Sequence, residues 1–239
     1  MPDRETSDSY GDNPEDYDPS EFEHPSVTVD ITIFTVKDND LKVALIKRKI
    51  WPFEGKWALP GGFIDIDESL EDAAERVLQD KTGVEDDVFL EQLYTFGETE
   101  RDPRKRVITV AYFALVNPEQ VKLHQTEEVE DISWHSAYDL PELGFDHKEI
   151  IDYAVKRLRW KLEYNTAVFS LLPEKFTLSQ LQDTYEIILD EDLDKRNFRK
   201  KIHKHDLVKD TGEKEKNVSH RPAKLYEANK EVGEIVEIL

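Results

Sequence analysis

The chain has 239 residues, of which 38% are hydrophobic, enough for one large domain or for a medium domain joined to a small one. It has no cysteine, which excludes disulfides and thiol catalysis and suits a cytoplasmic protein. It has no apolar run of roughly 18 residues, which excludes a membrane-spanning helix. The formal net charge of −21 argues against indiscriminate nucleic-acid binding, yet residues 195–230 hold twelve Lys or Arg against five Asp or Glu, a local net charge of +7.

Residues 1–24 are rich in Asp, Glu, Ser, Pro and Gly and contain almost no aliphatic side chains. This composition predicts a disordered acidic tail, and it matches neither a secretory signal nor a basic transit peptide. From Val27 apolar and polar residues alternate, break at residues 38–40 and resume to residue 49. That pattern predicts a β-hairpin.

Strands and helices mix in the next part of the chain. Strands are predicted over residues 57–64, 89–98, 106–116 and about 131–143, and the third is apolar enough to be central. A helix capped by Asp67 or Ser69 is predicted to end at about Thr82, with Gly83 as its stop. A second helix is predicted over residues 147–165. We therefore expect an α+β domain from residue 25 to residue 163.

The remaining residues, 164–239, have a different order of elements. A short extended piece near residue 172 precedes a predicted helix over residues 178–189. Asp194 is a suitable N-cap for a second helix, which is strongly basic. A strand, a long polar loop and another strand follow, up to residue 229. Helix, turn, basic helix and hairpin is the order of a winged helix-turn-helix.

Residues 62–84 resemble the Nudix box, whose pattern is G-x5-E-x7-R-E-U-x-E-E-x-G-U with U an aliphatic residue. The spacing is kept without an insertion at Gly62, Glu68, Arg76, Leu78, Gly83 and Val84. An amphipathic helix between two glycines does not explain why all of these positions fit together. The resemblance implies a Nudix α/β/α sandwich with a mixed sheet over residues 25–163.

The departures from the Nudix box concern the metal ligands. In hydrolases of this family, the glutamate after the arginine and a later glutamate pair bind Mg²⁺ or Mn²⁺, and water attacks a diphosphate. Here the three positions are Val77, Asp80 and Lys81. Valine cannot ligate, and lysine repels a cation. We therefore expect no catalytic residues, no metal site and no cofactor, with Mg²⁺ or Mn²⁺ needed only if the protein is a hydrolase.

A ligand pocket can survive the loss of catalysis. Lys81 either supplies positive charge to a phosphate or is an ordinary surface lysine near a helix C-terminus. The arginines of residues 101–106 suit an anion or a sugar, although a solvated loop is the plainer interpretation. Asp146 is a candidate helix cap, and His147 beside it is a candidate ligand contact. The predicted effector-binding residues are Glu68, Asp80, Lys81, Arg101, Arg104, Arg106 and His147.

The basic helix over residues 195–204 predicts a DNA-binding surface. Phe198 and Ile202 are four residues apart and face inward, which leaves a basic outer face whose Arg and Asn side chains can reach base edges. The loop after it ends in a basic tip at residues 219–224 that can clamp phosphate. A solvated polar face is the alternative. The predicted DNA contacts are Lys195, Arg196, Asn197, Arg199, Lys200, Lys204, His220, Arg221 and Lys224.

Over about residues 26–230 the chain resembles the Nudix-related transcriptional regulators of the NrtR type and their sugar-responsive relatives. The resemblance rests on WALPGGF, ERVLQDKTG, RDPRKRV, LPELGFDH, LLPEKFTLSQLQ, DKRNFRKKI and HRPAKLY. It implies a homodimer on a palindromic DNA operator, with recognition helices about 34 Å apart. It also implies an effector, an ADP-ribose-like nucleotide or a sugar such as arabinose, that releases the DNA. The degraded Nudix box weakens the case for the nucleotide and leaves room for the sugar.

Two other functions remain open from the sequence. One is a hydrolase of ADP-ribose or a related nucleoside diphosphate, against which Val77 and Lys81 argue. The other is a metabolite-binding adaptor that contacts protein rather than DNA. Steep salt dependence of DNA binding would separate an adaptor from a regulator.

Overall fold

The computed structural model describes residues 23–83, 88–119, 121–124, 129–216, 218–219, 221–236 and 238. The predicted acidic tail, apart from its last two residues, lies outside these ranges, and so does His220 of the predicted wing tip. In the described part of the chain, no helix is both long and apolar enough to cross a membrane.

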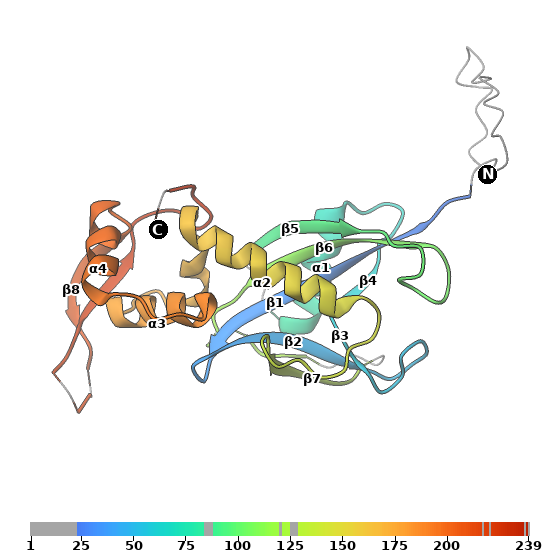
Figure 1. Ribbon diagram of the computed structural model, residues 1–239, viewed down its shortest axis with the longest axis horizontal. Helices are drawn as coiled ribbons and strands as arrows, with labels where there is room; N and C mark the ends of the chain where they lie inside the picture. Colours follow the sequence, from blue (N-terminus) through green and yellow to red (C-terminus); the bar gives the residue numbers. More distant parts are fainter. Residues whose placement is uncertain are drawn as a thin grey trace, which may run out of the picture.

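A mixed sheet of seven strands forms the centre of the larger half (Figure 1). Its central order is β3-β2-β1-β6-β5, with β4 also paired to β1 and β7 to β2. Among the strand pairs of the described residues, β1–β6 is parallel and the others are antiparallel. β6 lies between β1 and β5, which confirms the predicted central strand. The bounds are β1 Ser26–Lys37, β2 Asp40–Arg48, β3 Trp57–Ala58, β4 Gly61–Phe63, β5 Phe89–Phe96, β6 Val107–Leu115 and β7 Val129–Ser136.

The predicted hairpin between β1 and β2 is confirmed. It turns at Asp38 and Asn39, which have φ of 54° and 57°. A two-residue turn with both φ values positive matches the right-handed twist of the strands, and Asn and Asp tolerate that conformation.

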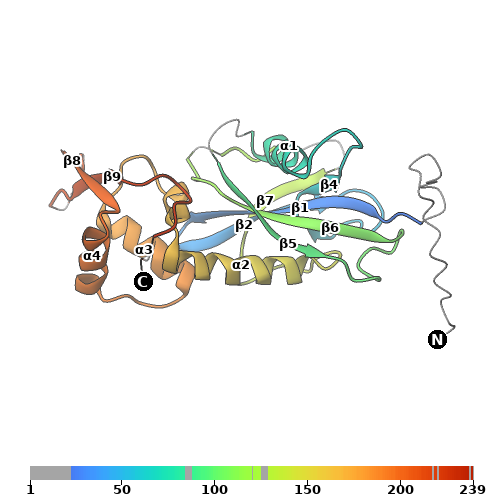
Figure 2. The same cartoon turned by 90° about the horizontal axis from the view of Figure 1, so that it is seen from above.

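Two helices cover opposite faces of the sheet, α1 (Leu70–Thr82) and α2 (His147–Tyr164) (Figure 2). On α1, Ala73, Ala74, Val77 and Leu78 are buried in one apolar cluster with side chains of β1 and β6. On α2, residues 150–162 contribute to a second cluster on the other face of the sheet. Of the two predicted caps for α1, Ser69 is the N-cap, and Gly83 ends the helix with a φ of 64°. This is the predicted α/β/α sandwich.

The smaller half contains a 3-10 helix, two α-helices and a two-stranded sheet. The 3-10 helix η3 (Thr166–Leu171) was not predicted. The predicted short extended piece follows η3, since the backbone is extended at Leu172. Tyr185 and Phe198 pack edge to face at 5.2 Å between α3 and α4, as expected for a helix-turn-helix core. The bounds are α3 Leu178–Leu189, α4 Lys195–Lys204, β8 Val208–Lys214 and β9 Lys224–Ala228.

The two halves meet at the C-terminal end of α3. The Tyr138 hydroxyl, which follows β7, lies 2.8 and 3.0 Å from the carbonyl oxygens of Ile187 and Ile188. Arg159 of α2 donates from Nε to the Ile188 carbonyl at 2.8 Å, and its guanidinium lies over the Tyr138 ring. The last carbonyls of a helix have no partner within it. Side chains of the larger half supply those partners for α3.

Candidate ligand pocket and nucleic-acid interface

A cavity of about 250 Å³ lies where β1 and β4 meet the loops that lead into β6 and α2. Of the predicted effector-binding residues, Arg101, Arg104 and His147 line it. Its other polar side chains, Thr28, Asp30, Arg48 and Asp102, were not predicted. Thr28 and Asp30 gave no signal in the sequence, because polar residues at alternate positions of a strand normally face solvent.

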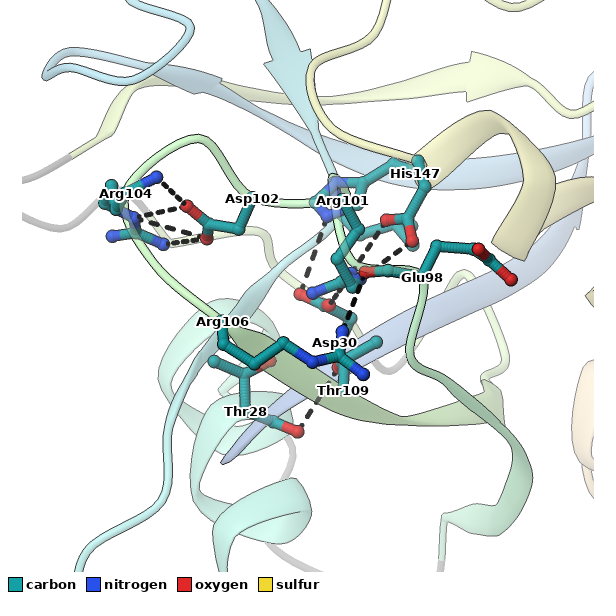
Figure 3. A network of polar contacts seen from close by, with 11 residues as sticks. Thr28, Asp30, Glu98, Arg101, Asp102, Arg104, Arg106, Thr109 and His147 are labelled. Atoms are coloured by element: carbon teal, nitrogen blue, oxygen red, sulfur yellow. Dashed lines mark hydrogen bonds and ion pairs between the residues drawn. The ribbon is translucent and has the colours of Figure 1, made fainter. Parts of the chain in front are cut away.

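Arg101 lines this cavity and is buried, with 7% of its surface exposed. Figure 3 shows its contact with Asp30. It donates to both carboxylate oxygens of Asp146, at 2.8 and 2.7 Å, and to Asp30 Oδ2 at 3.3 Å. Burial alone lowers the pKa of Arg101, but the hydrogen bonds and charges of these two carboxylates outweigh it and raise that pKa. A charged guanidinium therefore holds both acids in place.

Asp146 occupies the N-cap position of α2, as predicted, but its side chain makes no capping bond. Its carboxylate binds Arg101 instead, because a bidentate, charge-assisted pair is stronger than a hydrogen bond to a neutral amide. The partner lies far away in the sequence, which a local cap pattern cannot reveal.

His147 is the first residue of α2 and is 4% exposed. Its Nδ1 accepts a hydrogen bond from the backbone N–H of Leu59 at 2.8 Å, so the proton of the neutral ring is on Nε2. Burial lowers the pKa of His147, although Asp30 and Asp146 act to raise it. The ring is therefore neutral near pH 7 and presents an N–H donor, with Nε2 3.7 Å from Asp30 Oδ1.

Cationic and aromatic side chains form the mouth of the cavity. Asp102 accepts from the Arg104 guanidinium through both oxygens, at distances from 2.7 to 3.2 Å. The Arg104 guanidinium carbon lies 5.1 Å from the Phe63 ring centroid, and that of Arg48 lies 5.1 Å from the Phe145 ring centroid. Guanidinium groups over aromatic faces suit a planar ring or a phosphate group.

Four predicted effector-binding residues do not line the cavity. Glu68 is bound by Arg76, with Nε donating to Oε2 at 3.0 Å, and this hydrogen bond lowers the pKa of Glu68. Arg106 is exposed and donates to the Glu98 carbonyl at 3.0 Å. Asp80 and Lys81 lie in the last turn of α1. A role for these four residues in ligand binding stays a prediction.

The donor set on α1 does not fit a divalent metal. Val77 is 4% exposed, belongs to the apolar cluster under α1 and faces Gly62. Lys81 is the basic residue of the last turn. Over the ranges that the structure describes, no group of three or more His, Cys, Asp or Glu is arranged to hold a metal ion. Mg²⁺ and Mn²⁺ require several converging oxygen ligands, which this face of α1 does not provide.

The basic face of the smaller half is centred on α4. Phe198 and Ile202 are its buried residues, as predicted, and Arg199 is half-buried with Nη2 3.4 Å from Ser179 Oγ of α3. On β9, Lys224 is exposed and forms an ion pair with Asp210 at 2.6 Å. The predicted DNA contacts that are exposed are Lys195, Arg196, Asn197, Lys200, Lys204, Arg221 and Lys224.

A cleft of about 860 Å³ separates the start of α3 from α4 and the hairpin. Four of the predicted DNA contacts, Lys195, Arg199, Arg221 and Lys224, line it. They come from α4, from the loop before β9 and from the first residue of β9, and they line the same cleft. Converging Lys and Arg side chains are the arrangement that binds a phosphate backbone.

Comparison with known families assigns both halves of the chain. The profile of the NUDIX domain matches residues 26–154. The profile of the NrtR DNA-binding winged helix domain matches residues 168–228.

Known proteins that contain these domains are similar to this chain. The ADPR responsive transcriptional repressor NtrR of Acinetobacter baylyi is 40% identical over 88% of this chain and 84% of its own length. The crystal structure of Shewanella oneidensis NrtR complexed with a 27mer DNA is 40% identical, with a TM-score of 0.76, over 85% of this chain and 93% of that one. The NUDIX domain of the same Shewanella protein, complexed with ADP ribose, is 42% identical, with a TM-score of 0.54, over 60% and 95%.

Part of this chain is also similar to an enzyme. The ADP-ribose pyrophosphatase of Methanocaldococcus jannaschii is 37% identical over 58% of this chain and 76% of its own length.

Proposed function

Because this chain belongs to the NrtR family, with a Nudix domain and an NrtR DNA-binding winged helix domain in one polypeptide, we propose that it represses transcription until ADP-ribose binds its Nudix domain and releases the DNA. The chain is a ligand-responsive, DNA-binding transcriptional regulator. In this proposal residues 25–163 sense the ligand and residues 164–239 bind the operator. The relatives that respond to or bind ADP-ribose support the choice of effector.

The observation that carries the proposal is the convergence of basic side chains on one cleft of a strongly acidic protein. The whole chain has a formal net charge of −21, yet the cleft between α3, α4 and the hairpin is lined by Lys195, Arg199, Arg221 and Lys224. A negative protein attracts DNA only where positive charge is concentrated. We propose that this cleft and the exposed face of α4 contact the operator, with two copies of the chain on a palindromic site.

We propose further that the Nudix domain does not hydrolyse its ligand. Val77 and Lys81 stand where the family's hydrolases place metal-binding glutamates, and Val77 is part of the core. A hydrolase is the second candidate, because Glu68 and Arg76 are kept, Asp80 retains a carboxylate on a shorter side chain, and a pyrophosphatase is among the relatives. The geometry favours the sensor, since a carboxylate at position 80 alone cannot complete a magnesium site.

One titration tests the sensor against the hydrolase. DNA that binds the protein is first selected from a random duplex library, and its complex is followed by fluorescence anisotropy. ADP-ribose, arabinose or AMP is then added, with and without Mg²⁺, while nucleotide products are followed by chromatography. We expect intact ADP-ribose to dissociate the complex without Mg²⁺. Release of the DNA by arabinose and not by ADP-ribose would make the protein a sugar sensor. Formation of AMP from added ADP-ribose only in the presence of Mg²⁺ would establish a hydrolase.

A further inference from the structure

The hydroxyl of Thr28 is a buried polar group that the fold leaves unsatisfied. Thr28 is 7% exposed and lines the cavity of the Nudix domain. Its Oγ1 has no hydrogen-bond partner among the described residues. Buried hydroxyls are nearly always hydrogen-bonded, because leaving water without a new partner costs free energy. The cavity is the place from which a ligand can supply that partner.

Asp30 lies two residues further along β1, so its side chain is on the same face of the strand as Thr28. Its Oδ2 accepts a hydrogen bond from Arg101, whereas its Oδ1 lies 3.7 Å from His147 Nε2, too far for a hydrogen bond. A Cβ added to Gly61 would lie 2.2 Å from this Oδ1. The Asp30 carboxylate therefore packs directly against the backbone of Gly61 on β4, where there is no side chain.

The carboxylates in the cavity floor disfavour an anion beside Asp30. Arg101 pairs with two carboxylates, those of Asp30 and Asp146, and His147 is neutral. A phosphate placed directly against these carboxylates would be repelled by them. A neutral hydroxyl group fits better, since it can donate to Asp30 Oδ1 and accept from His147 Nε2–H at the same time.

We infer that Thr28, Asp30 and His147 form a subsite for adjacent hydroxyl groups of a ribose ring. The phosphates of the same ligand lie toward Arg48 and Arg104 at the mouth. This inference rests on the proposed function, because it takes a nucleotide carrying ribose as the ligand. It adds which part of that ligand the cavity floor recognises and which side chains do so.

Thr32 provides a matched control. It is on the same face of β1, is fully buried and also has an Oγ1 with no partner in the described part of the chain, but it does not line the cavity. Thr28→Val and Thr32→Val each remove one unsatisfied buried hydroxyl from the same strand. They differ in whether a ligand can reach the hydroxyl that is lost.

Isothermal titration of ADP-ribose and ADP into the full chain tests the subsite. We expect Thr28→Val to weaken ADP-ribose binding about tenfold, or about 1.4 kcal/mol, with Thr28→Ser and Thr32→Val close to the unsubstituted protein. A loss for ADP-ribose alone assigns the subsite to the terminal ribose, and an equal loss for ADP assigns it to the adenosine ribose. Equal affinity of Thr28→Val and the unsubstituted protein overturns the subsite but not the proposed function. If the unsubstituted protein binds neither nucleotide, the proposed function fails and the subsite fails with it.

Discussion

At the scale of single residues, Gly61 and Gly62 are adjacent in β4 but differ in the space around them. A Cβ on Gly61 would lie 2.2 Å from Asp30 Oδ1 and 2.7 Å from the Val29 carbonyl oxygen, whereas one on Gly62 would lie 3.8 Å from the nearest atom. We expect Gly61→Ala to lower the free energy of unfolding by about 1–3 kcal/mol, and Gly62→Ala to change it little. Urea unfolding of both variants measures this difference. Equal stability of the two would show that Asp30 can move away at little cost.

His147 makes stability depend on pH with a definite sign. Because burial lowers its pKa in the folded protein, the unfolded chain binds a proton more readily once the pH falls below about 6.5. The stabilisation is complete above that pH and is lost as the pH falls toward the folded pKa, by at most about 1.4 kcal/mol per pH unit.

We therefore expect stability to fall less steeply between pH 7 and pH 5.5 in His147→Asn than in the unsubstituted protein. The amide oxygen of Asn can still accept the Leu59 N–H, so the backbone contact is retained. Urea unfolding at several pH values provides the comparison. Parallel pH profiles would contradict a lowered His147 pKa.

A place in the ligand cavity was predictable for residues that stand out in their local sequence. It was not predictable for residues whose surroundings come from distant parts of the chain. Arg101, Arg104 and His147 stand in short segments with unusual charge, and all three line the cavity. Thr28 looks like any strand threonine, because the feature that distinguishes it is a cavity formed by other segments. The same reason explains why the ion pair of Asp146 was not predicted, since its carboxylate binds an arginine of another loop.

At the scale of elements, α1 keeps the Nudix frame but uses its inner face for packing. Val77→Glu alone would bury a carboxylate in an apolar cluster, and we expect it to destabilise the protein by about 3 kcal/mol.

Val77→Glu with Lys81→Glu would place carboxylates at positions 77, 80 and 81. We expect Mn²⁺ to raise the melting temperature of this double variant and not that of the unsubstituted protein, because a bound ion stabilises the folded state. Equal stabilisation of both proteins by Mn²⁺ would contradict the loss of the metal site.

The end of α3 depends on side chains from the larger half. Tyr138→Phe removes the hydroxyl that lies within 3.0 Å of the Ile187 and Ile188 carbonyls, and we expect a loss of about 0.5–1.5 kcal/mol in the free energy of unfolding. The exposed Tyr94 of β5 is a suitable control, since Tyr94→Phe removes a hydroxyl far from α3. Equal unfolding curves for the two variants would show that Arg159 alone holds the end of α3.

Element types were predictable wherever periodicity and caps agreed. Ser69, Gly83 and Asp194 stand at the predicted helix ends, and the paired strands β1 and β2 follow the alternating pattern. The 3-10 helix η3 was not predicted, because six residues provide too little periodicity to identify it. Its residues are held by contacts with the C-terminal segment, such as the Thr166 hydroxyl donating to the Glu231 carbonyl at 2.6 Å.

At the scale of the whole molecule, charge is distributed unevenly, and this predicts how salt affects DNA binding. Each phosphate contact contributes a slope of about −0.9 to the logarithm of affinity against the logarithm of salt concentration. We expect Arg196→Ala and Lys200→Ala on α4 each to make that slope shallower by about 0.9. Lys148→Ala on α2 removes the same kind of charge from the far half and should leave the slope unchanged. Equal slopes for all three variants would show that α4 does not contact DNA phosphates.

The helix α2 runs from the sheet of the larger half toward α3 (Figure 1). It begins at His147, which lines the ligand cavity, and contacts α3 through Arg159, about 18 Å further along at about 1.5 Å per residue. Inserting or deleting a single residue between them would turn Arg159 by about 100° and move it away from α3. Even a whole added turn would shift Arg159 by about 5.4 Å along the helix and break its bond to the Ile188 carbonyl, so this stretch of α2 keeps its length. The distance along α2 between the ligand cavity and the DNA-binding half is therefore fixed. A chimera that joins the sensor domain of one relative to the DNA-binding domain of another would have to preserve it.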